Sequence, residues 1–218
     1  MIDTIIFDLD GTLLDTLTDL MDSVNFALNK FGYPERSYDE IRRFVGNGVR
    51  VLMKKSVPNG VEGEDFEKAF SVFREHYLGN MRNKTDAYEG VRDVLKVLKE
   101  KNYKIGVVSN KLDSAVKELC KDYFGEFVDF AKGADGENDR KPNPENTWKC
   151  IEAVGAKKEN CIYVGDSEVD IKTAENAGLP CVSVSWGFRT REELTENNAK
   201  TIIDKPAELL PILQANVG

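Results

Sequence analysis

Residues 5–12 read Ile-Ile-Phe-Asp-Leu-Asp-Gly-Thr, an apolar run that ends in two carboxylates and a glycine. The apolar residues are typical of a buried strand, and Gly11 permits a tight turn after it. Side chains alternate along a strand, so Asp8 and Asp10 are expected to start on one side. Two like charges this close are costly unless a cation, a shared proton or solvent compensates them. The pair is therefore either a metal and catalytic site, or the end of a strand followed by a turn.

The composition of the 218-residue chain excludes several classes of protein. Its formal net charge of −8 argues against a general nucleic-acid binder, so an anionic ligand needs a local positive site. No stretch approaches the roughly 20 apolar residues that span a bilayer, and no signal peptide is expected because the sequence opens with strand residues. The four cysteines lack C-x-x-C spacing, which predicts free thiols in a reducing cytoplasm. With only His76, a two-histidine zinc centre cannot be built.

Apolar runs alternate with helical periodicity along most of the chain. The runs predict strands at residues 2–7, 103–108, 127–131, 161–164, 181–184 and 201–203. Helical spacing lies between them, at residues 91–101, 114–123, 144–154 and 169–177, near 191 and at 206–213. This alternation predicts an α/β fold with a doubly wound, mostly parallel sheet that is covered by helices on both faces.

Residues 15–86 interrupt the alternation, because they contain no convincing strand. Helices are expected there at residues 17–31, 38–44, 49–56 and 63–79. The segment is long for a connection between a strand and a helix. It predicts a small α-helical cap domain at 15–86, inserted into an α/β core formed by 1–14 and 87–218. Alternatively, these helices pack on the sheet as an ordinary layer.

Polar motifs fall at or near the ends of the expected strands. Besides Asp8 and Asp10, they are Ser109-Asn110, Lys141 in a proline-bracketed loop, and Asp166 with Asp170 after residues 161–164. Open α/β sheets bind ligands outside the carboxyl ends of their strands, so these side chains are candidates for a common site. Each motif also has a purely structural interpretation, as a helix cap, a surface lysine or helix N-terminal acids. Their occurrence together and in this order favours the functional interpretation.

These residue types suit phosphoryl transfer. A carboxylate can attack phosphorus, and a second carboxyl group can protonate the leaving oxygen and then activate water. A hydroxyl and backbone N–H groups can hold phosphate oxygens, and a lysine can neutralise developing charge. Further carboxylates can bind Mg²⁺, which prefers oxygen ligands.

The four motifs in this order resemble the haloacid dehalogenase superfamily, in its phosphatase branch, and the resemblance covers nearly the whole chain. It implies that Asp8 is the nucleophile and Asp10 the general acid and base. The phosphate-binding residues implied by the resemblance are Ser109, the backbone of Asn110, and Lys141. The implied cofactor is Mg²⁺, with Asp8, the backbone carbonyl of Asp10, Asp166 and Asp170 around it.

The finer resemblance is to the phosphoglycolate phosphatase group. Gly46, Asn47 and Gly48 are similar to a cap loop of that group, which implies contact with the substrate; a turn between two helices explains them equally well. Residues 185–189 resemble a segment of many bacterial members whose substrate is uncertain, so they do not identify the ligand. Lys111, beside the phosphate-binding motif, is expected to be exposed.

The sequence therefore predicts a Mg²⁺-dependent phosphatase that hydrolyses a small phosphorylated metabolite through an aspartyl-phosphate on Asp8. Phosphoglycolate is the leading candidate substrate. The alternatives are a phosphomutase similar to β-phosphoglucomutase, and a receiver-like signalling module without enzymatic activity. No nucleic-acid or membrane partner is expected, and the oligomeric state is left open.

Overall fold

The computed structural model describes residues 1–136 and 138–215, and the chain divides into two compact units. One unit, here called the core unit, comprises Met1–Leu14 and Ala87–Gly218. The other, called the helical unit, is Asp15–Asp86.

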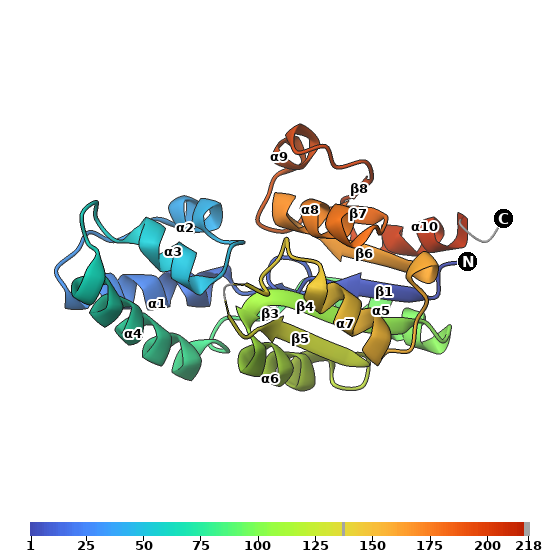
Figure 1. Ribbon diagram of the computed structural model, residues 1–218, viewed down its shortest axis with the longest axis horizontal. Coiled ribbons are helices and arrows are strands. Elements are labelled where there is room, and N and C mark those ends of the chain that lie inside the picture. Colours follow the sequence, from blue (N-terminus) through green and yellow to red (C-terminus); the bar gives the residue numbers. More distant parts are fainter. Residues whose placement is uncertain (137, 216–218) are drawn as a thin grey trace. The chain divides into compact units, whose positions relative to one another are not determined.

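The core unit is built on a six-stranded sheet with the strand order β5-β4-β1-β6-β7-β8, and all its strand pairs are parallel (Figure 1). The strands are β1 (Thr4–Phe7), β4 (Lys104–Leu112), β5 (Phe130–Ala134), β6 (Cys161–Gly165), β7 (Cys181–Val184) and β8 (Ile202–Ile203). A separate two-stranded sheet pairs β2 (Leu14–Asp15) with β3 (Asp86–Ala87). The strand β1 lies at the centre, with β4 and β6 on either side, so residues that follow these three strands emerge at the same edge.

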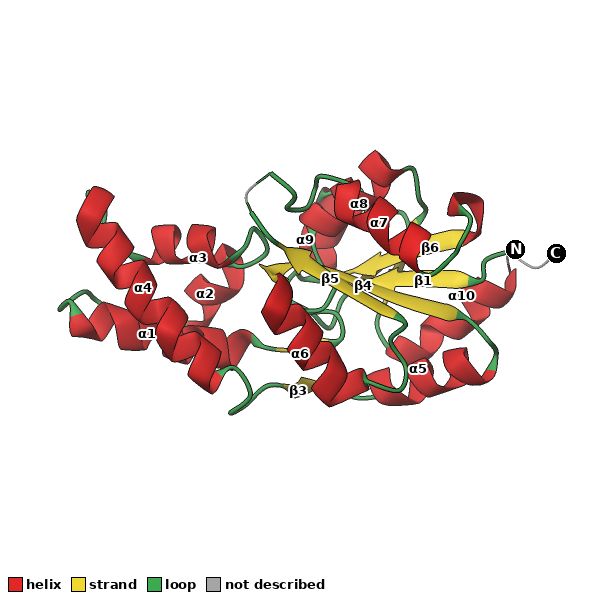
Figure 2. Ribbon diagram, turned by 60° about the horizontal axis from the view of Figure 1, so that its bottom comes forward, coloured by secondary structure: helices red, strands yellow, loops and turns green. Residues whose placement is uncertain are grey.

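Helices cover both faces of the large sheet, as Figure 2 shows: α7 and α8 lie on one face, and α5, α6 and α10 on the other. The helices of the core unit are α5 (Val91–Glu100), α6 (Asp113–Phe124), α7 (Glu145–Ala153), α8 (Glu168–Ala177), α9 (Arg191–Glu196) and α10 (Leu209–Ala215). Short 3-10 helices precede β6 and α10, at Lys158–Asn160 and Pro206–Glu208. Burial on both faces explains why the central strands are apolar throughout rather than alternating.

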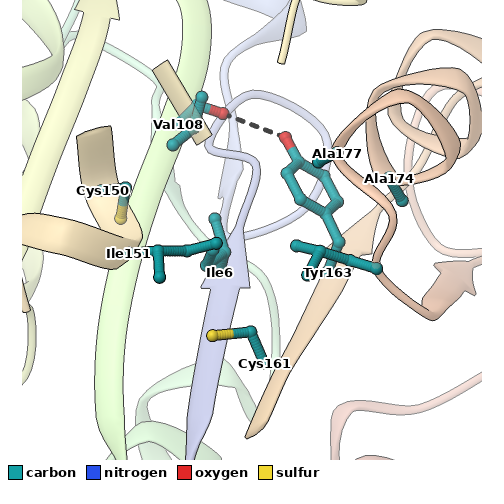
Figure 3. Packing of buried hydrophobic residues seen from close by; sticks show 9 residues of the cluster. Ile6, Val108, Cys150, Ile151, Cys161, Tyr163, Ala174 and Ala177 are labelled. Atoms are coloured by element: carbon teal, nitrogen blue, oxygen red, sulfur yellow. Dashed lines mark hydrogen bonds between the residues drawn. The ribbon is translucent and has the colours of Figure 1, made fainter. Parts of the chain in front are cut away.

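The face beneath α7 and α8 is packed with large apolar strand residues and small helix residues (Figure 3). Ile6 on β1 and Tyr163 on β6 are fully buried there, and Ala174 and Ala177 bring α8 close to the sheet. The Tyr163 hydroxyl donates a hydrogen bond to the Val108 carbonyl oxygen at 3.4 Å, which gives this buried polar atom a partner.

The helical unit contains four helices, α1 (Leu17–Lys30), α2 (Tyr38–Phe44), α3 (Val49–Ser56) and α4 (Gly63–Asn80). The helices α1 and α4 pack together, with Val24 and Leu28 buried on α1 and Phe73 and Tyr77 on α4. A capping box at Ser37 starts α2. The Ser37 side chain accepts a hydrogen bond from the backbone N–H of Glu40, and the Glu40 side chain accepts one from the backbone N–H of Ser37.

The fold class predicted from the sequence is confirmed, including the helical insertion after the first strand. Several boundaries differ, and the largest differences concern β4 and β5. The strand β4 continues through residues 109–112, and β5 begins at Phe130 rather than at Phe127. Phe127 and Val128 instead donate backbone hydrogen bonds to the Phe124 carbonyl, so they belong to the turn that ends α6.

Two further findings concern the cysteines and the membrane. All four cysteines are free, as expected, although Cys181 is half-buried rather than buried. Within residues 1–136 and 138–215, no helix combines the length and the apolar character needed to cross a bilayer.

We predict that Gly106→Ala destabilises the core unit, because a Cβ atom on this residue of β4 would overlap the Cys150 sulfur of α7. Overpacking of this kind costs about 1–3 kcal/mol. Urea denaturation should show this loss of unfolding free energy when Gly106→Ala is compared with the wild type. The loss should be smaller when Gly106→Ala is introduced into a Cys150→Ala chain and compared with Cys150→Ala alone, because the sulfur is then absent. Equal losses with and without the sulfur would refute this account of the packing.

Candidate active site

The polar residues singled out in the sequence come together at one edge of the large sheet. Asp8 follows β1 directly, Ser109 lies near the end of the neighbouring strand β4, and Asp166 follows β6 on the other side. Lys141 lies in the loop between β5 and α7, and Asp170 in the first turn of α8. Because all strands are parallel, their carboxyl ends meet at this edge.

Three carboxylates form a buried cluster there. Asp8, Asp166 and Asp170 each offer an oxygen atom that lies within 4.8 Å of the corresponding atoms of the other two. The residues are 7%, 1% and 0% exposed, so water screens their mutual repulsion poorly. Such a cluster is stable only if cations or protons compensate its charge.

Lys141 supplies part of this compensation. Its Nζ lies 2.7 Å from Oδ1 of Asp8 and 2.7 Å from Oδ1 of Asp170. The bond to Asp170 has hydrogen-bond geometry, whereas Oδ1 of Asp8 accepts no well-formed hydrogen bond and is held by charge alone. Burial by itself lowers the pKa of Lys141, but Asp170 and Asp8 outweigh it and raise that pKa well above its ordinary value. This lysine is therefore a fixed positive charge.

The loop that carries Lys141 is tied to β4 through Asn110. The Lys141 backbone N–H donates to Oδ1 of Asn110 at 2.6 Å, and Nδ2 of Asn110 donates to the Lys141 carbonyl at 3.1 Å. The side chain of Asn110 thus holds the lysine in place. This contact leaves the predicted role of Asn110, phosphate binding through its backbone, as a prediction.

Asp166 is contacted by a backbone N–H and a side-chain hydroxyl from two distant loops. Its Oδ2 accepts a hydrogen bond of 2.7 Å from the backbone N–H of Phe188, and its Oδ1 lies 3.5 Å from Oγ1 of Thr12. Gly11 has a φ of +88°, and a Cβ atom on it would overlap the Asp166 carboxylate. The glycine predicted from the sequence to allow a turn is therefore also required for this close approach.

Asp170 is held by the start of its own helix. Oδ2 of Asp170 accepts from the Ser167 backbone N–H at 3.1 Å and from the Ser167 hydroxyl at 2.6 Å. This is a capping box at the N-terminus of α8. The interpretation of Asp170 as a helix N-terminal acid is therefore correct, and the same side chain also belongs to the carboxylate cluster through its other oxygen.

The charges of the cluster shift the pKa values of its members. Burial raises the pKa of Asp8 to about 7, with Lys141 opposing the rise and Asp170 adding to it. Burial also raises the pKa of Asp166 well above its ordinary value, and the charges of Asp170 and Asp8 add to that rise. The single ammonium of Lys141 therefore does not compensate the three carboxylates.

The cluster fits a divalent cation. It provides carboxylate oxygens from three residues within a small space, and these are the ligands that Mg²⁺ takes in proteins. Burial and the neighbouring carboxylates raise the pKa values of Asp8 and Asp166, and a bound cation would favour the ionised form of both side chains.

Asp10 lies beside this cluster and contacts residues of β4. Its Oδ1 is 2.9 Å from Nζ of Lys111, and its Oδ2 is 3.5 Å from Oγ of Ser109. The expectation that Lys111 is exposed was wrong, because its side chain is only 3% accessible. The strand β4 extends past Val108, and this extension brings Lys111 beside Asp10 in the segment that follows β1.

Gly46, Asn47 and Gly48 lie in the helical unit, between α2 and α3. Gly46 and Gly48 have φ angles of +114° and +83°, and Gly48 is the residue that precedes the first turn of α3. The interpretation as a turn between helices is therefore correct. Contact of this loop with a substrate stays a prediction.

Sequence comparison assigns the family. Residues 5–184 match the haloacid dehalogenase-like hydrolases, and the chain belongs to this family. It is 31% identical to phosphoglycolate phosphatase 1 of Pseudomonas aeruginosa, over 95% of this chain and 78% of that protein. It is 30% identical to the phosphoglycolate phosphatase of Aquifex aeolicus, over 98% and 97% of the two chains.

Solved structures agree with this assignment. A protein from Lactobacillus delbrueckii subsp. bulgaricus superposes with a TM-score of 0.91 at 32% identity, covering 97% of this chain and 98% of that one. A predicted phosphoglycolate phosphatase from Haemophilus somnus gives 0.89 at 27% identity, with 97% of both chains covered. The expected phosphoglycolate phosphatase-like subfamily and the expected enzyme class, a phosphoric monoester hydrolase, are confirmed.

Sequence reasoning missed the contribution of residues 185–189. Phe188 binds Asp166 through its backbone, and the neighbouring Arg189 is bonded through Nε and Nη2 to Glu168 at 2.8 and 3.1 Å. A Cβ atom on Gly187 would overlap the Gly11 carbonyl and the Asp166 side chain. The tryptophan, glycine and arginine in this segment were the only sequence signal for this contact.

The raised pKa values predict how the stability of the metal-free protein depends on pH. Folded Asp8 and Asp166 keep protons at pH values where the unfolded chain, with carboxyl pKa values near 4, has lost them. The free energy of unfolding should therefore fall as pH rises from about 4 through the folded pKa of Asp8, about 7.

Urea denaturation in a chelator, at about pH 5 and about pH 8, measures this loss. We expect Asp166→Asn to reduce the loss by at least about 1 kcal/mol, since it removes one charge of the cluster. Glu175→Gln, which removes an exposed carboxylate of α8, is the matched control and should behave like the wild type. An undiminished loss in Asp166→Asn would contradict the electrostatic account, as would a failure of Mg²⁺ to restore wild-type stability at the higher pH.

Proposed function

We propose that this protein is a Mg²⁺-dependent phosphatase that hydrolyses a small phosphorylated metabolite through an aspartyl-phosphate on Asp8. Phosphoglycolate is the leading candidate, since relatives covering nearly the whole chain bear the name phosphoglycolate phosphatase. The observation that carries the proposal is the cluster of Asp8, Asp166 and Asp170 around Lys141 at the carboxyl edge of the sheet.

In the first step, a carboxylate oxygen of Asp8 attacks phosphorus and the bond from phosphorus to the substrate oxygen breaks. Asp10 protonates that leaving oxygen, and the alcohol departs. In the second step, Asp10 takes a proton from water, and the water oxygen attacks phosphorus of the aspartyl-phosphate. Inorganic phosphate leaves, and Asp8 is restored. The position of Asp10, two residues after Asp8 and not part of the buried cluster, supports this division of roles.

The residues around Asp8 support the transferred phosphoryl group. We assign to Lys141 the neutralisation of phosphoryl oxygens, since it already contacts Asp8. We assign to Ser109 and the backbone of Asn110 the binding of phosphate oxygens, by the family resemblance and by the place of Ser109 next to Asp10.

Mg²⁺ would be held by Asp8, Asp166, the backbone carbonyl of Asp10 and Asp170, the last of these acting directly or through water. When bound, it supplies positive charge for the phosphoryl oxygens and lowers the repulsion between phosphate and the Asp8 carboxylate. The buried and uncompensated charge of these side chains supports the assignment.

The experiment that tests this proposal is a panel of phosphorylated metabolites, phosphoglycolate included, assayed for phosphate release with Mg²⁺ and with a chelator.

We expect Asp8→Asn to lower kcat by roughly a thousandfold or more. Asp10→Asn should lower it by about 10²- to 10⁴-fold, the usual contribution of a general acid and base. Asp65→Asn, in an exposed carboxylate of α4, is the control that should retain full activity.

Several outcomes contradict the proposal. Normal turnover by Asp8→Asn would exclude the covalent mechanism, and equal rates with chelator would exclude the metal. Isomerisation of a hexose phosphate with little release of inorganic phosphate would identify a phosphomutase instead.

The cap loop provides a separate prediction. If Asn47 hydrogen-bonds the substrate, Asn47→Ala should raise KM for the best metabolite of the panel by about tenfold, the cost of one lost polar contact. The stability of the protein should change little, because Gly48 rather than Asn47 precedes α3. An unchanged KM would remove Asn47 from the proposed substrate contacts.

A further inference from the structure

A second buried lysine, Lys111, lies at the same edge of the sheet as Lys141 but contacts a different carboxylate. Its side chain is 3% exposed, and its Nζ lies 2.9 Å from Oδ1 of Asp10. Lys141 contacts Asp8 and Asp170 instead. Burying an ammonium is costly unless it is paired, and the contact with Asp10 compensates part of the charge of Lys111.

Both oxygens of the Asp10 carboxylate are contacted from the end of β4. Lys111 contacts Oδ1, while Oγ of Ser109 lies 3.5 Å from Oδ2, at the limit of a hydrogen bond. The same Oγ accepts a hydrogen bond of 3.2 Å from the backbone N–H of Lys111. The three residues therefore form one connected group, in which two residues of β4 determine the direction of a carboxylate that follows β1.

The direction of Asp10 matters for the proposed reaction. Its side chain is 18% exposed, and its two carboxylate oxygens are contacted by Lys111 and Ser109. A general acid must lie within hydrogen-bond reach of the leaving oxygen, and a misplacement of about 1 Å can cost about 10²-fold in rate.

We propose that Lys111 is a positioning residue that fixes the Asp10 carboxylate for proton transfer to the leaving oxygen. The inference rests on the proposed function, because it assumes that Asp10 is the general acid. In this arrangement Lys111 acts through Asp10, whereas Lys141 acts on Asp8 and the transferred phosphoryl group.

The leaving group of the substrate tests this inference. Phenyl phosphate releases a poor leaving group that requires a proton, whereas dinitrophenyl phosphate releases one that leaves without it. We expect Lys111→Met to lower kcat/KM for phenyl phosphate about tenfold or more, and for dinitrophenyl phosphate by less than about threefold. Because both substrates are assayed on one preparation, the ratio of the two values does not depend on the folded fraction.

Two further variants complete the experiment. In an Asp10→Asn background, Lys111→Met should no longer change the ratio, since residues that act through one another are not additive. Lys132→Met is the matched control: Lys132 lies on β5 and pairs with Asp113 at 3.3 Å, away from Asp10, and its replacement should leave the ratio unchanged.

Equal losses on both substrates in Lys111→Met would overturn the inference, as would a ratio that still changes in the Asp10→Asn background. Failure of the proposed function is a different result. In that case the wild type would release no phosphate from any metabolite of the panel with Mg²⁺, or Asp8→Asn would release it normally.

Discussion

The crowding of carboxylates at the ends of β1 and β6 is the constraint on which the rest of this site depends. Asp8, Asp166 and Asp170 lie within 4.8 Å of one another in a place that water hardly reaches. A cluster like this lowers stability unless positive charge is brought to it. Lys141 provides one such charge, and burial together with the neighbouring carboxylates still raises the pKa values of Asp8 and Asp166. In the proposed Mg²⁺-dependent phosphatase, the charge that destabilises the metal-free fold would favour binding of the metal.

Backbone groups rather than bulky side chains make room for the cluster. Gly11 and Gly187 both approach Asp166 so closely that a side chain on either would overlap it. The Phe188 N–H and the capping box at Ser167 then direct the oxygens of Asp166 and Asp170. These contacts come from loops after β1, β6 and β7, which the parallel sheet brings to one edge. The strands thus hold a polar site that by itself lowers the stability of the fold, as functional sites commonly do.

Much of this architecture could be predicted from the sequence because its determinants are local. The apolar strands, the helical segment after Asp15 and the short motifs at Asp8 and Asp166 are each visible within a few residues. The start of β5 was missed because Phe127 and Val128 are apolar but serve the turn after α6. The contacts of Lys111 with Asp10 and of Phe188 with Asp166 could not be predicted, since they join residues 101 and 22 positions apart. Nothing in the sequence around Lys111 indicates that its side chain is buried, because the burial depends on the extension of β4, which places Lys111 beside Asp10.

The most direct test of the central claim is to detect the covalent intermediate on the residue that the site designates. The enzyme is mixed with Mg²⁺ and its best substrate, quenched in acid within the first turnover, digested and analysed by mass spectrometry. The account predicts a phosphoryl group on Asp8, in the peptide containing residues 5–12, that disappears as substrate is consumed. Rapid phosphate release with no modified peptide, or with the phosphoryl group on another residue, would contradict it.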